Sequence, residues 1–96
     1  MMRKTIESRF PARAMEILKL LHGSDRGLRF AELVARLKLY NQTAAAALAW
    51  LTMRELAVRQ VIHEAPPRNV QYVITLKGKD LVQAMEPVDD WRRRWG

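Results

Sequence analysis

Few residues in this chain have the type and spacing needed for chemistry. His22 and His63 are far apart in the sequence, and neither has a carboxylate at the spacing of a metal site. Asp89 and Asp90 precede a run of arginines, and we expect ion pairs with the arginines one helical turn later rather than a catalytic dyad. The absence of cysteine excludes disulfides, thiolate metal sites and thiol redox sensing. We therefore expect no enzyme activity, no metal and no cofactor.

Arginine is the functional residue type that stands out. The chain has 17 Lys and Arg against 10 Asp and Glu, which gives a formal net charge of +7. A small domain this basic usually has an anionic partner, most often nucleic acid, although charge can also serve solubility alone. No apolar run is long enough to span a bilayer, and the N-terminus lacks the apolar core of a signal peptide. We expect a cytoplasmic protein without a membrane partner.

Apolar residues at helical spacing predict three successive helices in the first half of the chain. The first begins near Pro11, because the missing N–H of proline is tolerated in a first helical turn. The second covers residues 30–37, after a very short strand at 28–29. The third covers residues 42–55, with Asn41 capping its N-terminus.

The pattern then changes to strands. Alternating and β-branched residues predict strands at 56–64 and 70–74, joined by a proline-rich tip. Thr75 caps a last helix over 76–86, and Pro87 breaks or kinks it before a final turn or two.

This order of elements is that of a winged helix-turn-helix, an α+β fold that is mostly helical, with the two-stranded hairpin as its wing. The 96 residues make one domain. We divide the chain into a basic arm or short helix at 1–10, the winged helix-turn-helix domain at 11–86 and a dimerisation segment at 87–96.

The third helix is the element expected to enter a major groove of double-stranded DNA. With its alanine and leucine stripe turned inward, its outward face carries Gln42 and small or apolar residues, with no Lys or Arg before Arg54. Bidentate reading of guanine is therefore unavailable from this helix, whereas Gln42 can read adenine and Ala45 or Ala46 can touch a thymine methyl group.

Affinity must then come from cations around the third helix that contact phosphates. Each of these is alternatively a solvated surface charge; Arg68 at the wing tip is the strongest candidate, for a minor groove. The predicted DNA-binding residues are Arg29, Arg36, Lys38, Asn41, Gln42, Thr43, Ala45, Ala46, Ala49, Arg54, Arg59, Arg68 and Asn69. The smooth outward face leaves a second interpretation open, a winged-helix module that binds a protein instead of specific DNA.

Two motifs resemble the HxlR-type transcriptional regulators, a branch close to the MarR group. Arg-Phe-Ala-Glu-Leu at 29–33 resembles the Arg-Phe-x-Glu-Leu opening of that family's second helix. The segment at 66–78 resembles the family's Pro-Pro-Arg-Val-Glu-Tyr-x-Leu-Thr-x-x-Gly wing, with one residue inserted at Asn69. Leu81 and Trp91 fall where the family places a Leu and a Trp of its last helix.

The resemblance implies a DNA-binding homodimer, built through terminal helices, that represses or activates transcription. Val88, Trp91 and Trp95 share one helical face and are the expected dimer contacts, unless they fold back onto the core of their own chain. The chain departs from the family in lacking the N-terminal cysteine with which many members sense electrophiles. It also has Glu55 where the family often has glycine, and its third helix lacks the usual polar and basic readers. The sequence does not identify an effector.

Overall fold

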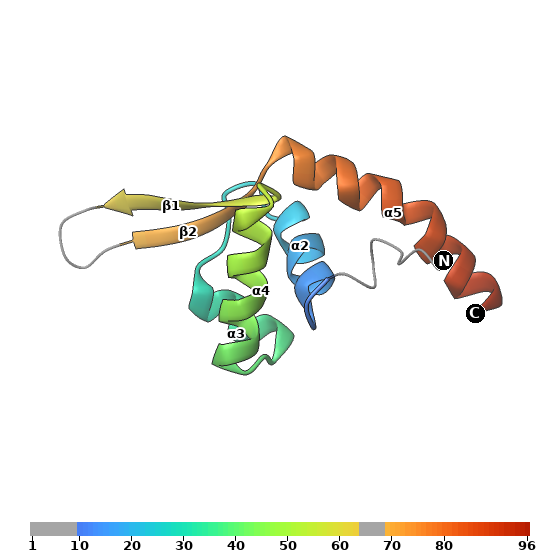
Figure 1. Cartoon of the computed structure of the whole chain (residues 1–96), viewed down its shortest axis with the longest axis horizontal. Helices are drawn as coiled ribbons and strands as arrows, with labels where there is room; N and C mark the ends of the chain where they lie inside the picture. The colour runs from blue at the N-terminus through green and yellow to red at the C-terminus, as the bar shows by residue number, and fades with distance from the viewer. Residues whose placement is uncertain (1–9, 64–68) are drawn as a thin grey trace, which may run out of the picture.

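A computed structural model describes residues 10–63 and 69–96 of the chain. Three helices, α2 (Ala14–His22), α3 (Phe30–Leu37) and α4 (Asn41–Met53), precede the antiparallel strands β1 (Ala57–His63) and β2 (Asn69–Ile74). The chain ends with α5 (Leu76–Trp95). Figure 1 shows the hairpin projecting from one end of the helical body and α5 from the other. The structure confirms the predicted winged helix-turn-helix.

The core lies where the helical periodicity predicts it. Four residues of α2 at helical spacing are fully buried, and the four inward positions of α4 are buried against them. The core contains no polar or charged side chain among residues 10–63 and 69–96. The buried residues of these two helices are Ala14, Ile17, Leu18, Leu21, Ala44, Ala47, Leu48 and Leu51. Because two of the α4 positions are alanines, α2 can approach α4 closely.

The wing is joined to the body by a third extended segment. The Leu28 N–H donates to the Tyr72 carbonyl at 2.9 Å, and the Tyr72 N–H donates to the Leu28 carbonyl at 2.7 Å. This bridge confirms the predicted short strand at its first residue. It also fixes β2 relative to the start of α3, since only Arg29 separates Leu28 from that helix.

The motif Thr-x-x-Gly anchors the start of α5. The Thr75 hydroxyl accepts a hydrogen bond from the Gly78 N–H at 3.0 Å and donates to the Glu55 carbonyl at 2.6 Å. A Cβ at position 78 would collide with the Leu56 carbonyl, so only glycine fits there. Thr75 is thus the predicted cap, and it also ties α5 to the turn between α4 and β1.

Two predicted helix starts are wrong by a few residues. Helix α2 begins at Ala14 rather than near Pro11, because Arg13 has a left-handed backbone (φ 66°) and its guanidinium donates to the Leu37 carbonyl at 2.9 Å. Asn41 is the first residue of α4 rather than its cap; the N-cap is Tyr40, which makes no capping hydrogen bond with its side chain.

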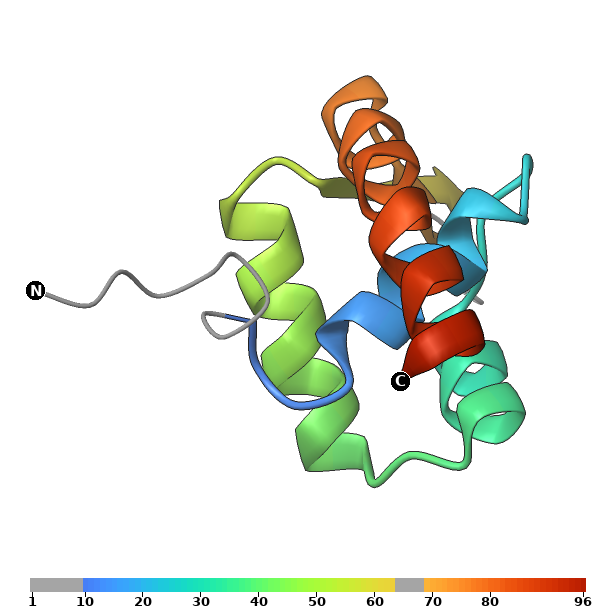
Figure 2. The same ribbon diagram turned by 90° about the vertical axis from the view of Figure 1, so that its right-hand side faces the viewer.

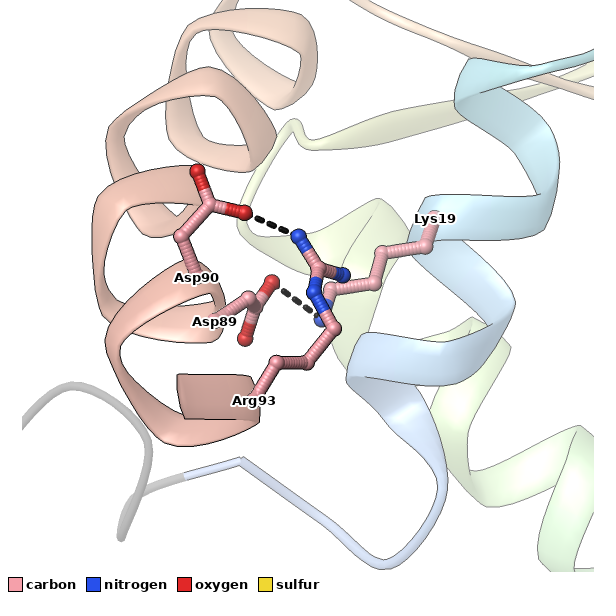
Figure 3. Close-up of polar contacts among 4 residues, drawn as sticks. All are labelled: Lys19, Asp89, Asp90 and Arg93. Atoms are coloured by element: carbon pink, nitrogen blue, oxygen red, sulfur yellow. Dashed lines mark hydrogen bonds and ion pairs between the residues drawn. The ribbon is translucent and has the colours of Figure 1, made fainter. Parts of the chain in front are cut away.

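Of the two predicted effects of Pro87, a break or a kink, the break does not occur, because α5 continues to Trp95. The boundary at 86/87 between domain and dimerisation segment therefore lies inside one helix. Just beyond the proline, the Lys19 ammonium of α2 pairs with the Asp89 carboxylate at 2.7 Å, while Asp90 pairs with Arg93 within α5 (Figure 3). The expected pair with a following arginine is confirmed for Asp90, and Asp89 has a partner on α2 that the sequence did not predict.

The hairpin and α5, at opposite ends of the helical body, together give the molecule its length (Figure 1). The principal-axis extents are 49 × 27 × 25 Å. Figure 2, turned by 90°, shows α5 crossing in front of α2, and Figure 1 shows its last turns beyond the helical body. Within the described ranges, no helix is both long and apolar enough to cross a membrane.

Candidate nucleic-acid interface

The exposed side of α4 is smooth and uncharged. No residue from Asn41 to Met53 carries a charge. Gln42, Ala45, Ala46 and Ala49 are all exposed, as the inward stripe of α4 requires. Met53 at the end of the helix is 83% exposed. This face therefore offers methyl groups, a thioether and one amide to whatever binds it.

A hollow of about 280 Å³ separates this face of α4 from the wing. Its lining residues are Phe30, Ala45, Leu48, Ala49, Thr52, Arg59 and Tyr72. Arg59 is the charged residue among them; it lies on β1 opposite Tyr72 of β2 in the hairpin register. The structure thus brings together three predicted DNA-binding residues, Ala45 and Ala49 of α4 and Arg59 of β1, at one concave surface.

The predicted cations of α3 are exposed at its two ends. Arg29 precedes the helix, and its backbone N–H donates to the Glu32 carboxylate at 3.0 Å. Arg36, in the last turn, lies 3.9 Å from the same carboxylate. Such an exposed ion pair is weak, so the Arg36 guanidinium stays accessible to another anion. Lys38 ends α3 in a left-handed conformation (φ 53°), three residues before α4 begins.

Arg54 lies apart from this group. Its guanidinium is 5.0 Å from the centre of the Trp50 ring, a cation–π contact. Phe10 also lies beside Trp50, with ring centres 4.6 Å apart. At 100° per residue, Arg54 is on the opposite side of α4 from Ala45. The geometry therefore does not bring Arg54 to the hollow between α4 and the wing.

A second cavity, of about 320 Å³, lies on the Arg54 side of α4. Its lining residues are Phe10, Trp50, Arg54, Leu56, Lys77 and Leu81. The Lys77 ammonium donates to the Arg54 carbonyl at 2.8 Å and so stabilises the C-terminal end of α4.

Three other predicted site residues are less accessible or lie outside the described ranges. Thr43 is half-buried on α4. Asn69 is half-buried at the start of β2, and its side-chain oxygen is buried without a hydrogen-bond partner among the described residues. Arg68 falls in 64–68, outside the residues that the structure describes.

Tyr40 is a surface residue that the sequence reasoning missed. It precedes α4 directly and is 83% exposed. A phenol hydroxyl at this position can donate a hydrogen bond to a phosphate. The available signal in the sequence is a lone aromatic residue directly before the third helix.

The apolar face of the C-terminal segment is exposed. Trp91 is 61% exposed and Trp95 is 74% exposed, with Val88 beside them on α5. These side chains do not fold back onto the core of their own chain, so that alternative does not describe the structure.

Comparison with known proteins gives the family. A model of the HxlR-like helix-turn-helix family matches residues 13–96. An uncharacterized HTH-type transcriptional regulator from Methanothermobacter thermautotrophicus is 33% identical over 73 residues, which are 75% of this chain but 55% of the relative. The chain thus spans little more than half the length of that relative. YvaP of Bacillus subtilis, also named an HTH-type transcriptional regulator, is 32% identical over 83 residues, covering 85% of this chain and 73% of YvaP.

Solved structures agree with this assignment. The reduced form of the transcriptional regulator YodB from B. subtilis superposes with a TM-score of 0.80 at 26% identity, over 99% of this chain and 95% of YodB. The MepR–DNA complex from S. aureus superposes with a TM-score of 0.75 at 21% identity, over 86% of this chain and 61% of MepR, which shows the shared fold. The chain belongs to the HxlR-like helix-turn-helix family, whose named relatives here are transcriptional regulators and not enzymes.

Proposed function

We propose that this protein regulates transcription by binding double-stranded DNA as a homodimer, with α4 in the major groove and the wing at the minor groove or backbone. The observation that carries the proposal is the uncharged, small-residue face of α4 beside the hollow that holds Arg59. A helix without bulky or acidic side chains can approach base edges closely. That a protein of the same fold, MepR, is known in complex with DNA supports the proposal.

Phosphate contacts from the elements around α4 supply most of the affinity in this proposal. Helix α4 has no cation of its own, whereas Arg29, Arg36, Lys38 and Arg59 are exposed on α3, the following turn and β1. Contacts of this kind position the protein on the duplex without reading its sequence. Arg68, assigned from the sequence alone, would add a minor-groove contact at the wing tip.

The C-terminal half of α5 supports the homodimer. A buried tryptophan removes roughly 150–250 Å² of surface from water, so two exposed tryptophans per chain form a large apolar contact when copies pair. A twofold axis makes such a patch self-complementary. Val88, Trp91 and Trp95 are the residues assigned to this contact.

The test uses an added charge on the face of α4. We expect Ala46→Glu to weaken DNA binding about tenfold or more, because a carboxylate would then lie against phosphates and base edges. Glu is nearly as good a helix former as Ala, so the melting temperature should not change. Both quantities are measured on the same preparation, by fluorescence anisotropy with a duplex selected from a random pool and by thermal denaturation.

Gln83→Glu is the matched control, since it adds the same charge at an exposed position of α5, away from α4. We expect it to keep full DNA affinity. If Ala46→Glu melts normally and binds DNA as well as the unaltered protein, the DNA proposal is wrong for α4, and this face becomes a protein-docking surface.

A further inference from the structure

Hydrogen-bonding side chains occur at only a few places along α4. Asn41, Gln42 and Thr43 occupy its first turn. The next hydroxyl, that of Thr52, donates to the Ala49 carbonyl at 3.0 Å and is used within the helix. The indole of Trp50 is half-buried beside Phe10 and Arg54. The middle of the exposed face therefore presents only methyl groups.

Ala45, Ala46 and Ala49 carry these methyl groups, and Ala45 and Ala49 also line the hollow beside Arg59. In the major groove, base pairs differ in their donors and acceptors and in one apolar group, the C5-methyl of thymine. A methyl surface placed over a donor or acceptor leaves that polar group unpaired, which is unfavourable. Placed over a thymine methyl, the same surface removes apolar area from water.

We propose that Ala45, Ala46 and Ala49 recognise thymine by its C5-methyl group, so that thymines facing the middle of α4 are specificity determinants of each half-site. This inference rests on the proposed entry of α4 into the major groove. Ala45 and Ala49 are about 6 Å apart along the helix axis, close to the rise of two base-pair steps. Each half-site thus presents thymines to both residues within about three consecutive pairs.

Deoxyuridine isolates this contact, because it differs from thymidine by the C5-methyl group alone. We expect a selected duplex with deoxyuridine at the thymines facing α4 to bind about fourfold more weakly for each methyl removed. Deoxyuridine at thymines outside the contacted pairs should leave the dissociation constant unchanged. Placing 5-methylcytosine at an unmethylated cytosine that faces α4 should strengthen binding.

The protein side of the test removes the alanine methyl groups. For each duplex pair, the dissociation constant of the uracil duplex is divided by that of the thymine duplex. We expect Ala45→Gly and Ala49→Gly to lower this ratio towards one, because the alanine methyl group that contacts the thymine methyl is gone. Ala35→Gly, at an exposed position of α3, should leave this ratio unchanged, although it lowers helix propensity about as much as the two α4 variants do. Ala45→Ser and Ala49→Ser replace the methyl surface with a hydroxyl and address the case in which a glycine variant does not fold.

The outcomes separate this inference from the proposed function. The inference is supported if uracil substitution weakens DNA binding only at certain positions and if this loss of affinity is smaller in Ala45→Gly and Ala49→Gly. Equal affinity for thymine and uracil duplexes at every position, with tight DNA binding retained, overturns the methyl contact and leaves DNA binding intact. Failure to bind any duplex overturns both.

Discussion

Glu55 has a backbone conformation that glycine usually adopts. It lies between α4 and β1 with φ 61°, in the left-handed region that glycine enters without steric cost. Its carbonyl accepts from the Thr75 hydroxyl, so the turn is held by α5. The resemblance to the HxlR-type regulators places glycine at this position, and the backbone angle gives the physical reason. The side chain of Glu55 is exposed, so core packing does not require a side chain at this strained backbone position.

We expect Glu55→Gly to stabilise the protein by about 1 kcal/mol, because a non-glycine residue in this conformation costs about that much. Chemical denaturation would measure the change in the free energy of unfolding. Glu86→Gly, in the exposed middle of α5, is the control and should destabilise by roughly 1 kcal/mol. A loss of stability in Glu55→Gly would mean that the glutamate side chain makes a favourable contact in solution.

The surroundings of Arg54 could not be predicted residue by residue from the sequence, and its DNA contact stays a prediction. Its position after an uncharged helix suggested a phosphate contact, but the Trp50 ring holds its guanidinium on the other side of α4. The spacing of four residues between Trp50 and Arg54 was a usable signal, since such residues are neighbours on a helix. By contrast, Arg59 could be assigned to a strand but not to the hollow, because that surface forms only when β1 packs beside α4.

Among the helices and strands, the features that follow from local residue patterns could be predicted from the sequence. The inward stripes of α2 and α4, the two strands and the cap at Thr75 all match the structure. The course of α5 does not follow from local rules. Pro87 lacks an N–H and normally ends a helix, yet α5 continues, and its ion pair with α2 joins residues 70 positions apart. No local pattern identifies Lys19 as the partner of Asp89.

The Lys19–Asp89 pair links α2 to the C-terminal half of α5 (Figure 3). We expect Asp89→Asn to lower the free energy of unfolding by at most about 1 kcal/mol, because the pair is partly exposed. The larger expected effect is a wider spread of α5 orientations. Spin labels on Asp25→Cys and Arg94→Cys would report this spread, since the chain has no other cysteine.

Asp90→Asn is the control for this experiment, because Asp90 pairs with Arg93 inside α5 and not with α2. Its distance distribution should match that of the labelled parent. An equally narrow distribution in Asp89→Asn would show that apolar packing alone orients α5.

For the whole molecule, the exposed tryptophans of α5 predict self-association. We expect the protein to sediment at twice the chain mass at micromolar concentration, and Trp91→Ala with Trp95→Ala to give a monomer. Leu76→Ala removes another exposed apolar side chain, 75% exposed, from the opposite end of α5 and should leave the dimer intact. A monomeric parent protein would remove the basis for the proposed dimer contact.

The distribution of charge predicts a steep salt dependence of DNA binding. Log affinity should fall linearly with log salt, and Arg59→Ala should reduce the slope by about one, because one phosphate contact is lost. Arg54→Ala removes the same charge on the Trp50 side of α4, where we expect no change in slope. Equal slopes for the two variants would place both arginines, or neither, at the DNA backbone.

The continuity of α5 through Pro87 has a mechanical consequence. Its 20 residues make a rod of about 30 Å that is tied to the body at Thr75, pairs with Lys19 of α2 through Asp89 and carries the tryptophans near its far end. A rotation of about 6° at the root displaces the far end by about 3 Å, close to the 3.4 Å step between stacked bases. In a pair of copies joined at those ends, this lever converts a slight change beside Thr75, where α5 begins, into a different separation of the two reading helices, so the spacing between half-sites is set far from the surface that touches them.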